Sequence, residues 1–141
     1  MRQSVLVIAL VAVSMAPVLA QKPRPHEAEF REFYAKFLAA VRANDKEKLA
    51  DLIAFPVDDW SVERRGDVQT GKIKDRADFL ARYNSLFTPF MRSHIPRAKL
   101  TPLDNGSYIL VWRDAGSEFS FDFAYSDGSG YRVTSYNIGP L

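Results

Sequence analysis

Apolar side chains recur every three or four residues between positions 30 and 41, and this spacing predicts an amphipathic helix with one wide apolar face. Glu32 and Lys36 lie on the other face, four residues apart, where opposite charges attract along a helix. The stripe is therefore expected to lie in the core of the fold. Its members are Phe30, Phe33, Tyr34, Phe37, Leu38 and Val41.

The last third of the chain predicts three antiparallel strands over residues 108–113, 118–125 and 131–138, separated by two turn-forming stretches. If both turns close symmetrically, the large apolar residues fall on one face, which supports that register. The expected pairs are Trp112–Phe119, Leu110–Phe121 and Tyr108–Phe123, then Phe123–Val133 and Tyr125–Tyr131. The opposite face is expected to carry Ile109, Val111, Tyr136 and Ile138 with Ser120, Asp122 and Thr134.

Between these two regions the sequence predicts two further helices. Asn44 or Asp45 can cap a short helix that ends before Pro56, because their side chains accept hydrogen bonds from free backbone N–H groups. Asp75 can cap a longer helix with apolar positions from Phe79 to Phe87, and Pro89 breaks or bends it.

A hairpin is expected between the two helices, with Gly66 and Asp67 as its turn. This turn places Trp60 opposite Ile73. Alternation along the strand then directs Trp60 to the core and Asp59 to solvent, as in an antiparallel sheet with one buried and one solvent-exposed face.

This order of elements resembles the nuclear transport factor 2-like superfamily of cystatin-like α+β cones. The resemblance rests on the stripe of residues 30–38, on the stretch 52–57, and on residues 71–75 leading into the helix of residues 79–87. It implies an α+β fold in which a curved antiparallel sheet wraps around a long N-terminal helix, with two further helices. The resemblance covers most of residues 27–138, and its last stretch, residues 71–87, is similar to exported bacterial members without assigned activity. The resemblance implies a fold and a pocket but no chemistry.

Residues 1–20 have the pattern of a cleavable signal peptide: Arg2, then an apolar run, then Val18 and Ala20 before the expected cleavage site. An uncleaved anchor is the alternative, although the apolar run is shorter than a bilayer requires. Cleavage near Ala20 would leave a flexible arm, residues 21–26, and a single domain, residues 27–141. We expect a periplasmic or secreted protein without a stable membrane anchor.

The charge and the histidines exclude several functions. The formal net charge of +2 is spread along the chain, without the basic patch that nucleic-acid binding needs. His26 and His94 lack the ligand spacing of a metal site, so we expect neither a metal nor another cofactor.

The expected cone offers a candidate site for a small apolar ligand. Filling of the cone by its own side chains is the alternative. The expected lining consists of Trp60, Phe79, Tyr83, Trp112, Phe121 and Phe123.

Two carboxylates could serve as acid or base, as in the isomerases of the superfamily that this chain resembles. Asp58 shares a face with Trp60 and could look into the mouth of the cone. Asp122 lies among aromatic residues, but the expected register turns it away from the cone.

We therefore predict an exported, non-enzymatic domain that binds a small ligand or another protein. An acid–base isomerase or dehydratase with a carboxylate in the pocket is the alternative. A homodimer could form through the outer sheet face, at Ile109, Val111 and Tyr136.

Overall fold

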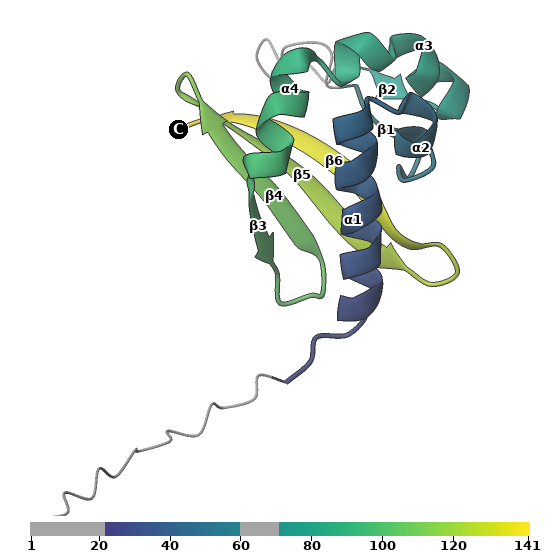
Figure 1. Ribbon diagram of the computed structural model, residues 1–141, viewed down its shortest axis with the longest axis vertical. Helices are drawn as coiled ribbons and strands as arrows, with labels where there is room; N and C mark the ends of the chain where they lie inside the picture. Colours follow the sequence, from purple (N-terminus) through teal and green to yellow (C-terminus); the bar gives the residue numbers. More distant parts are fainter. Residues whose placement is uncertain (1–21, 60–70) are drawn as a thin grey trace, which may run out of the picture.

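The computed structural model describes residues 22–59 and 71–141, and the fold is given for these residues (Figure 1). The helices are α1 (Glu27–Ala43), α2 (Lys46–Ala50), α3 (Arg76–Leu86) and α4 (Pro89–His94), followed by the 3-10 turn η1 (Ile95–Arg97). The strands are β1 (Val57–Asp58), β2 (Lys72–Ile73), β3 (Lys99–Pro102), β4 (Tyr108–Asp114), β5 (Ser117–Ser126) and β6 (Gly130–Pro140).

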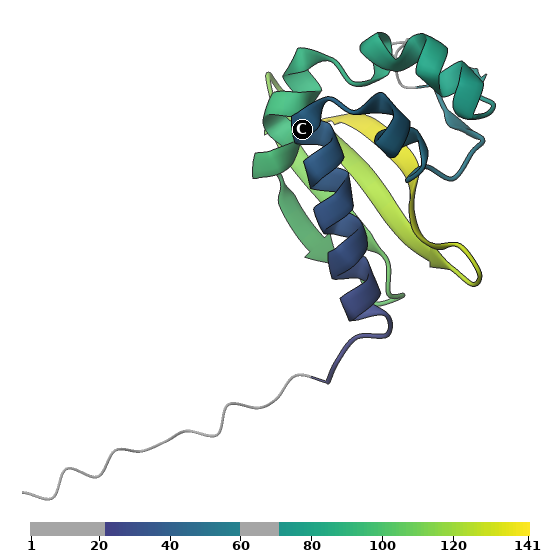
Figure 2. The same cartoon turned by 45° about the vertical axis from the view of Figure 1, so that its right-hand side comes forward.

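A curved four-stranded antiparallel sheet in the order β3-β4-β5-β6 wraps around α1. Figure 2 shows α1 lying along the hollow of the sheet, with α2 and α3 beyond its C-terminal end. The expected α+β class and the sheet around a long first helix are therefore confirmed.

Aromatic packing joins α1 to the sheet. Phe37 is fully buried, and its ring lies 5.2 Å from that of Phe123 and 5.9 Å from that of Phe121. At the start of the helix, Phe30 stacks on Tyr108 with ring centroids 3.4 Å apart. Four residues of the predicted apolar stripe, Phe30, Phe33, Phe37 and Val41, therefore lie in the core, whereas Tyr34 and Leu38 are half-buried at its edge.

Two of the predicted caps are present. Asp45 accepts a hydrogen bond from the backbone N–H of Lys48 at the start of α2, and Asp75 accepts one from Asp78 at the start of α3. Asn44, the other candidate for the first cap, ends α1 in the left-handed conformation with φ of 54°. Short polar side chains adopt that conformation more readily than most residues.

The register of the first hairpin is confirmed along its whole length, from Tyr108↔Phe123 to Arg113↔Glu118. In the second hairpin the expected pairs Phe123↔Val133 and Tyr125↔Tyr131 are also present.

Between Phe123 and Asp122 a β-bulge shifts the register of β5 with β6. Phe123 pairs with Val133 but Asp122 pairs with Ser135, so Thr134 is an extra residue on β6. One extra residue reverses the direction of every side chain that follows. The prediction that Tyr136 lies on the outer face is therefore wrong: it faces inward, 4% exposed, with its ring 4.8 Å from that of Phe121.

Strand β3 was not predicted. It contains only four residues, ends in Pro102, and forms an edge of the sheet, so its sequence carries little strand signal. Its pairing with β4 places Leu100 opposite Leu110 and extends the inner face.

The predicted register of the middle hairpin is also wrong. Ile73 pairs with Val57 instead of Trp60, a shift of three residues, and an odd shift exchanges the two faces. Asp59, expected in solvent, is consequently buried. The predicted turn at Gly66 and Asp67, like Trp60 itself and the predicted signal peptide, lies outside the described residues.

None of the helices in the described ranges is both long enough and apolar enough to cross a membrane.

Replacement of Phe37 by alanine should lower the free energy of unfolding by about 3–5 kcal/mol, because it leaves a cavity between α1 and the sheet. Urea unfolding followed by circular dichroism measures the loss. The matched control is Phe90→Ala, since Phe90 is 37% exposed; it should cost less than about 1 kcal/mol. Equal losses for the two variants would contradict the assignment of Phe37 to the core.

The inward position of Tyr136 predicts a loss of stability at alkaline pH. Burial raises the pKa of its hydroxyl, whereas an unfolded tyrosine ionises near pH 10. Above about pH 10 the unfolded chain releases a proton that the folded chain retains, so the free energy of unfolding falls as pH rises. Urea unfolding between pH 8 and pH 11.5 should show a shallower fall for Tyr136→Phe than for the unchanged protein. Identical slopes would place Tyr136 in solvent.

Candidate functional site

The predicted lining of the cone is packed into the core, as far as the structure describes it. Phe79, Tyr83, Phe121 and Phe123 are buried. Phe87 fills the space between α3 and the sheet, because its ring stacks on Phe121 at 5.8 Å and also contacts Phe79 at 6.1 Å. Phe79, Tyr83, Phe121 and Phe123 therefore pack in the core. This is the alternative given above, in which the side chains of the protein fill the cone.

Trp112, near the end of β4, differs from the other predicted lining residues. Its side chain is 6% exposed, yet its indole Nε1 is a buried side-chain polar atom without a hydrogen-bond partner in the described parts of the protein. An indole nitrogen only donates, so a buried oxygen or other acceptor is what it lacks. An unsatisfied buried donor costs about 1–3 kcal/mol, and native structures contain few of them.

A row of aromatic rings connects Trp112 with the surface. Phe119 stacks on Trp112 with centroids 5.5 Å apart and is half-buried. Phe90 of α4 lies 5.5 Å from Phe119 and 4.3 Å from the ring of His94. In Figure 1, α4 lies next to the end of the sheet at which β4 turns into β5. We call Trp112, Phe119, Phe90 and His94 the aromatic row.

Two buried aromatic rings close the inner end of the row. Tyr136 and Phe121 lie 6.1 Å and 5.9 Å from Trp112, measured between ring centroids. The Tyr136 hydroxyl is protonated at neutral pH, because an ordinary tyrosine ionises only near pH 10 and burial raises its pKa further. The inner end is therefore aromatic and uncharged, and suits a neutral or weakly polar group.

Neither predicted carboxylate lies beside the aromatic row. Asp58 is half-buried and forms an ion pair with Lys72 of β2 at 2.6 Å. Asp122 lies on the outer face, where it accepts hydrogen bonds from Ser135 and from Asn137 on β6. The direction predicted for Asp122, away from the cone, agrees with this placement.

The buried carboxylate of the described region is Asp59, which the sequence prediction had placed in solvent. Arg82 of α3 approaches it to 2.5 Å and also contacts Asp78 at 2.8 Å. The alternation in the predicted hairpin could not reveal Asp59, because the burial of this residue follows from the three-residue shift in register. A neighbouring guanidinium stabilises the ionised carboxylate, which suits a structural ion pair better than a proton acceptor.

The histidines lie at opposite ends of the sheet. His26 stacks on Tyr125 at 3.7 Å, and its Nδ1 lies 2.7 Å from a carboxylate oxygen of Glu29. His94 Nδ1 lies 2.8 Å from the carbonyl oxygen of Phe90. Among the described side chains, no group of three histidine, aspartate or glutamate residues is placed to hold a metal ion.

The outer sheet face carries two of the three predicted interface residues. Ile109 and Val111 are half-buried on this face, next to the polar pairs of Asp122. Tyr136 is absent from the face because of the bulge. The homodimer through this face stays a prediction.

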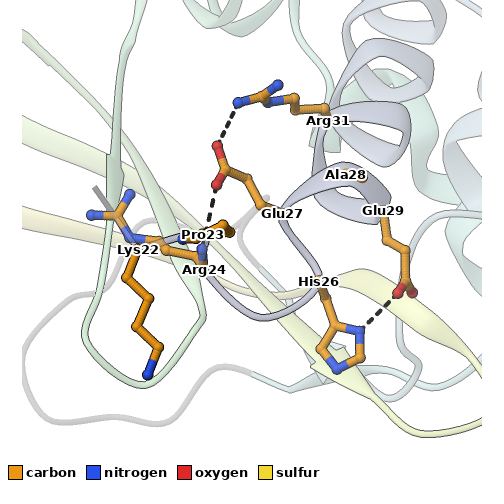
Figure 3. A pocket seen from close by; sticks show the side chains of 8 residues that line it. All are labelled: Lys22, Pro23, Arg24, His26, Glu27, Ala28, Glu29 and Arg31. Carbon is orange, nitrogen blue, oxygen red and sulfur yellow. Dashed lines mark hydrogen bonds and ion pairs between the residues drawn. The ribbon is translucent and has the colours of Figure 1, made fainter. Parts of the chain in front are cut away.

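A charged hollow of about 840 Å³ lies at the start of α1, where sequence reasoning expected only a flexible arm (Figure 3). Its two carboxylates are paired within it, Glu29 with His26 and Glu27 with Arg31. Glu27 receives the guanidinium of Arg31 at 2.5 Å and the backbone N–H of Arg24 at 3.5 Å, and these bonds lower the pKa of its carboxyl group. Most of the side chains that line the open hollow are charged, which does not favour an apolar ligand.

No protein-family model and no curated protein matches the chain. Among solved structures, it is similar to a nuclear transport factor 2 (NTF2-like) superfamily protein from Salmonella enterica subsp. enterica serovar Typhimurium. The two are 11% identical over 80% of this chain and 89% of that chain, with a TM-score of 0.43. The sequence itself resembles the same superfamily.

Proposed function

We propose that this chain is an exported, non-enzymatic domain that binds a small, largely apolar ligand at the aromatic row. The unpartnered indole N–H of Trp112 is the observation that carries the proposal. The signal pattern of residues 1–20 supports export.

The chemistry of the row suggests what such a ligand contains. Stacked rings at Trp112 and Phe119 favour a flat apolar or aromatic body. The indole N–H requires an acceptor, such as a carbonyl or ether oxygen. A few fixed polar groups within an apolar surface are typical of small-molecule sites.

Binding without catalysis is favoured over the acid–base alternative by the positions of the carboxylates. Asp58 and Asp122 are engaged at the surface, and Asp59 is paired with Arg82. A general base must come within hydrogen-bond reach of the proton that it removes, and none of these three residues belongs to the aromatic row.

A matched pair of probes tests the role of the indole N–H. Acetophenone carries a carbonyl oxygen, whereas ethylbenzene has a similar body without an acceptor. Acetophenone should move the indole N–H resonance of Trp112 downfield in a ¹H–¹⁵N spectrum and should bind about tenfold more tightly than ethylbenzene. The Trp112→Phe variant assigns the resonance.

The same variant supplies the control, because phenylalanine retains an aromatic ring and removes only the donor and part of the ring. In Trp112→Phe the preference for acetophenone over ethylbenzene should disappear, while the circular dichroism spectrum stays the same. If both probes bind equally to the unchanged protein, or if neither moves the Trp112 resonance, the proposed site is wrong.

A further inference from the structure

A second concave surface, of about 490 Å³, lies between α1 and the edge strand β3. It is lined from α1 by Tyr34, Leu38 and Arg42, from β3 by Leu100 and Pro102, and from β4 by Tyr108. We call it the helix–strand groove. Its residues are separate from the aromatic row, so the inference goes beyond the proposed function.

The floor of the groove is apolar and only partly covered. Tyr34 and Leu38 are half-buried, because they lie beside the buried face of α1 instead of within it. Leu100 and Pro102 are half-buried on the opposite side. The volume is within the range of about 300–1,000 Å³ that is usual for small-molecule sites.

The rim of the groove is basic. At one end the Arg31 guanidinium is engaged by Glu27, as Figure 3 shows. At the other end Arg42 forms no ion pair with any residue in the described ranges. The positive charge of Arg42 is felt by Tyr34 on the floor of the groove. Burial raises the pKa of Tyr34, and the Arg42 guanidinium partly offsets that rise. Arg42 therefore offers an anionic ligand a guanidinium at this end of the groove, and Arg24 lines the opposite end.

We propose that the helix–strand groove binds a single-chain fatty acid, with the carboxylate on Arg42 and the acyl chain along Leu38 and Leu100 toward Tyr108. A guanidinium matches a carboxylate in charge and in the geometry of two parallel hydrogen bonds. Arg42 lies eleven positions after Arg31, which corresponds to about 16 Å along a helix. This length suits an extended chain better than a compact ring.

Isothermal titration of the protein with dodecanoate tests the proposal, with dodecyltrimethylammonium as the ligand of equal chain length and opposite charge. Dodecanoate should bind, and dodecyltrimethylammonium should bind at least tenfold more weakly. Arg42→Gln should weaken dodecanoate binding about tenfold or more. The matched control is Arg113→Gln, which removes the same charge from an exposed hairpin position and should change the affinity less than twofold.

Several outcomes would overturn the proposal. Equal binding of the two amphiphiles, or equal effects of the two arginine variants, would show a non-specific apolar or charge effect. Binding to phosphatidylglycerol vesicles without binding to free dodecanoate would assign the groove to a membrane surface. If Trp112→Phe loses dodecanoate binding and Arg42→Gln retains it, the fatty acid binds at the aromatic row instead of the groove. A negative result in the acetophenone experiment alone would not affect the proposal for the helix–strand groove.

Discussion

The contact between Phe123 and the aromatic face of α1 is the interaction on which the rest of the fold depends. The ring of Phe123 lies 5.5 Å from Phe33, 6.0 Å from Tyr34 and 5.2 Å from Phe37. Because the chain contains no cysteine, no disulfide can support this packing. Each buried ring removes about 150–250 Å² from water, worth about 25 cal/mol per Å². The curvature of the sheet follows α1, so every site described above is positioned by this contact.

Sequence reasoning was most accurate where short turns join strands that alternate strictly. The turn at residues 114–117 determines the register from Tyr108 to Arg113, and a one-residue slip would expose Phe121 and Phe123. The bulge could not be predicted, because Thr134 is acceptable on either face and adds no turn signal. Its consequence, the inward direction of Tyr136, was missed with it. Strand β3 and the register of β1 with β2 could not be predicted for a related reason. Strands of two to four residues contain too few alternating side chains to show which face is buried.

The candidate site was only partly predictable, because the same aromatic residues can fill a core or line a pocket. Phe79, Phe121 and Trp112 look equivalent in the sequence, and all three are buried. Trp112 differs because its indole Nε1 has no hydrogen-bond acceptor in the described parts of the protein. The sequence cannot show this, because an acceptor could come from any segment that the fold brings close. The helix–strand groove was equally hidden, since Leu38 and Arg42 come together with Leu100 only when β3 joins the sheet.

Other buried rings with polar atoms show that the fold can satisfy such groups. The Tyr83 hydroxyl donates to Asn44 at 2.8 Å, and the Tyr131 hydroxyl donates to the carbonyl oxygen of Gly106 at 2.8 Å. The unpartnered N–H of Trp112 is therefore a local exception. A ligand that supplies an acceptor would remove a cost that the folded protein already bears, so part of its affinity would come from that relief. A ligand without an acceptor would leave the cost in place, and discrimination of this kind exceeds what an apolar surface alone can provide.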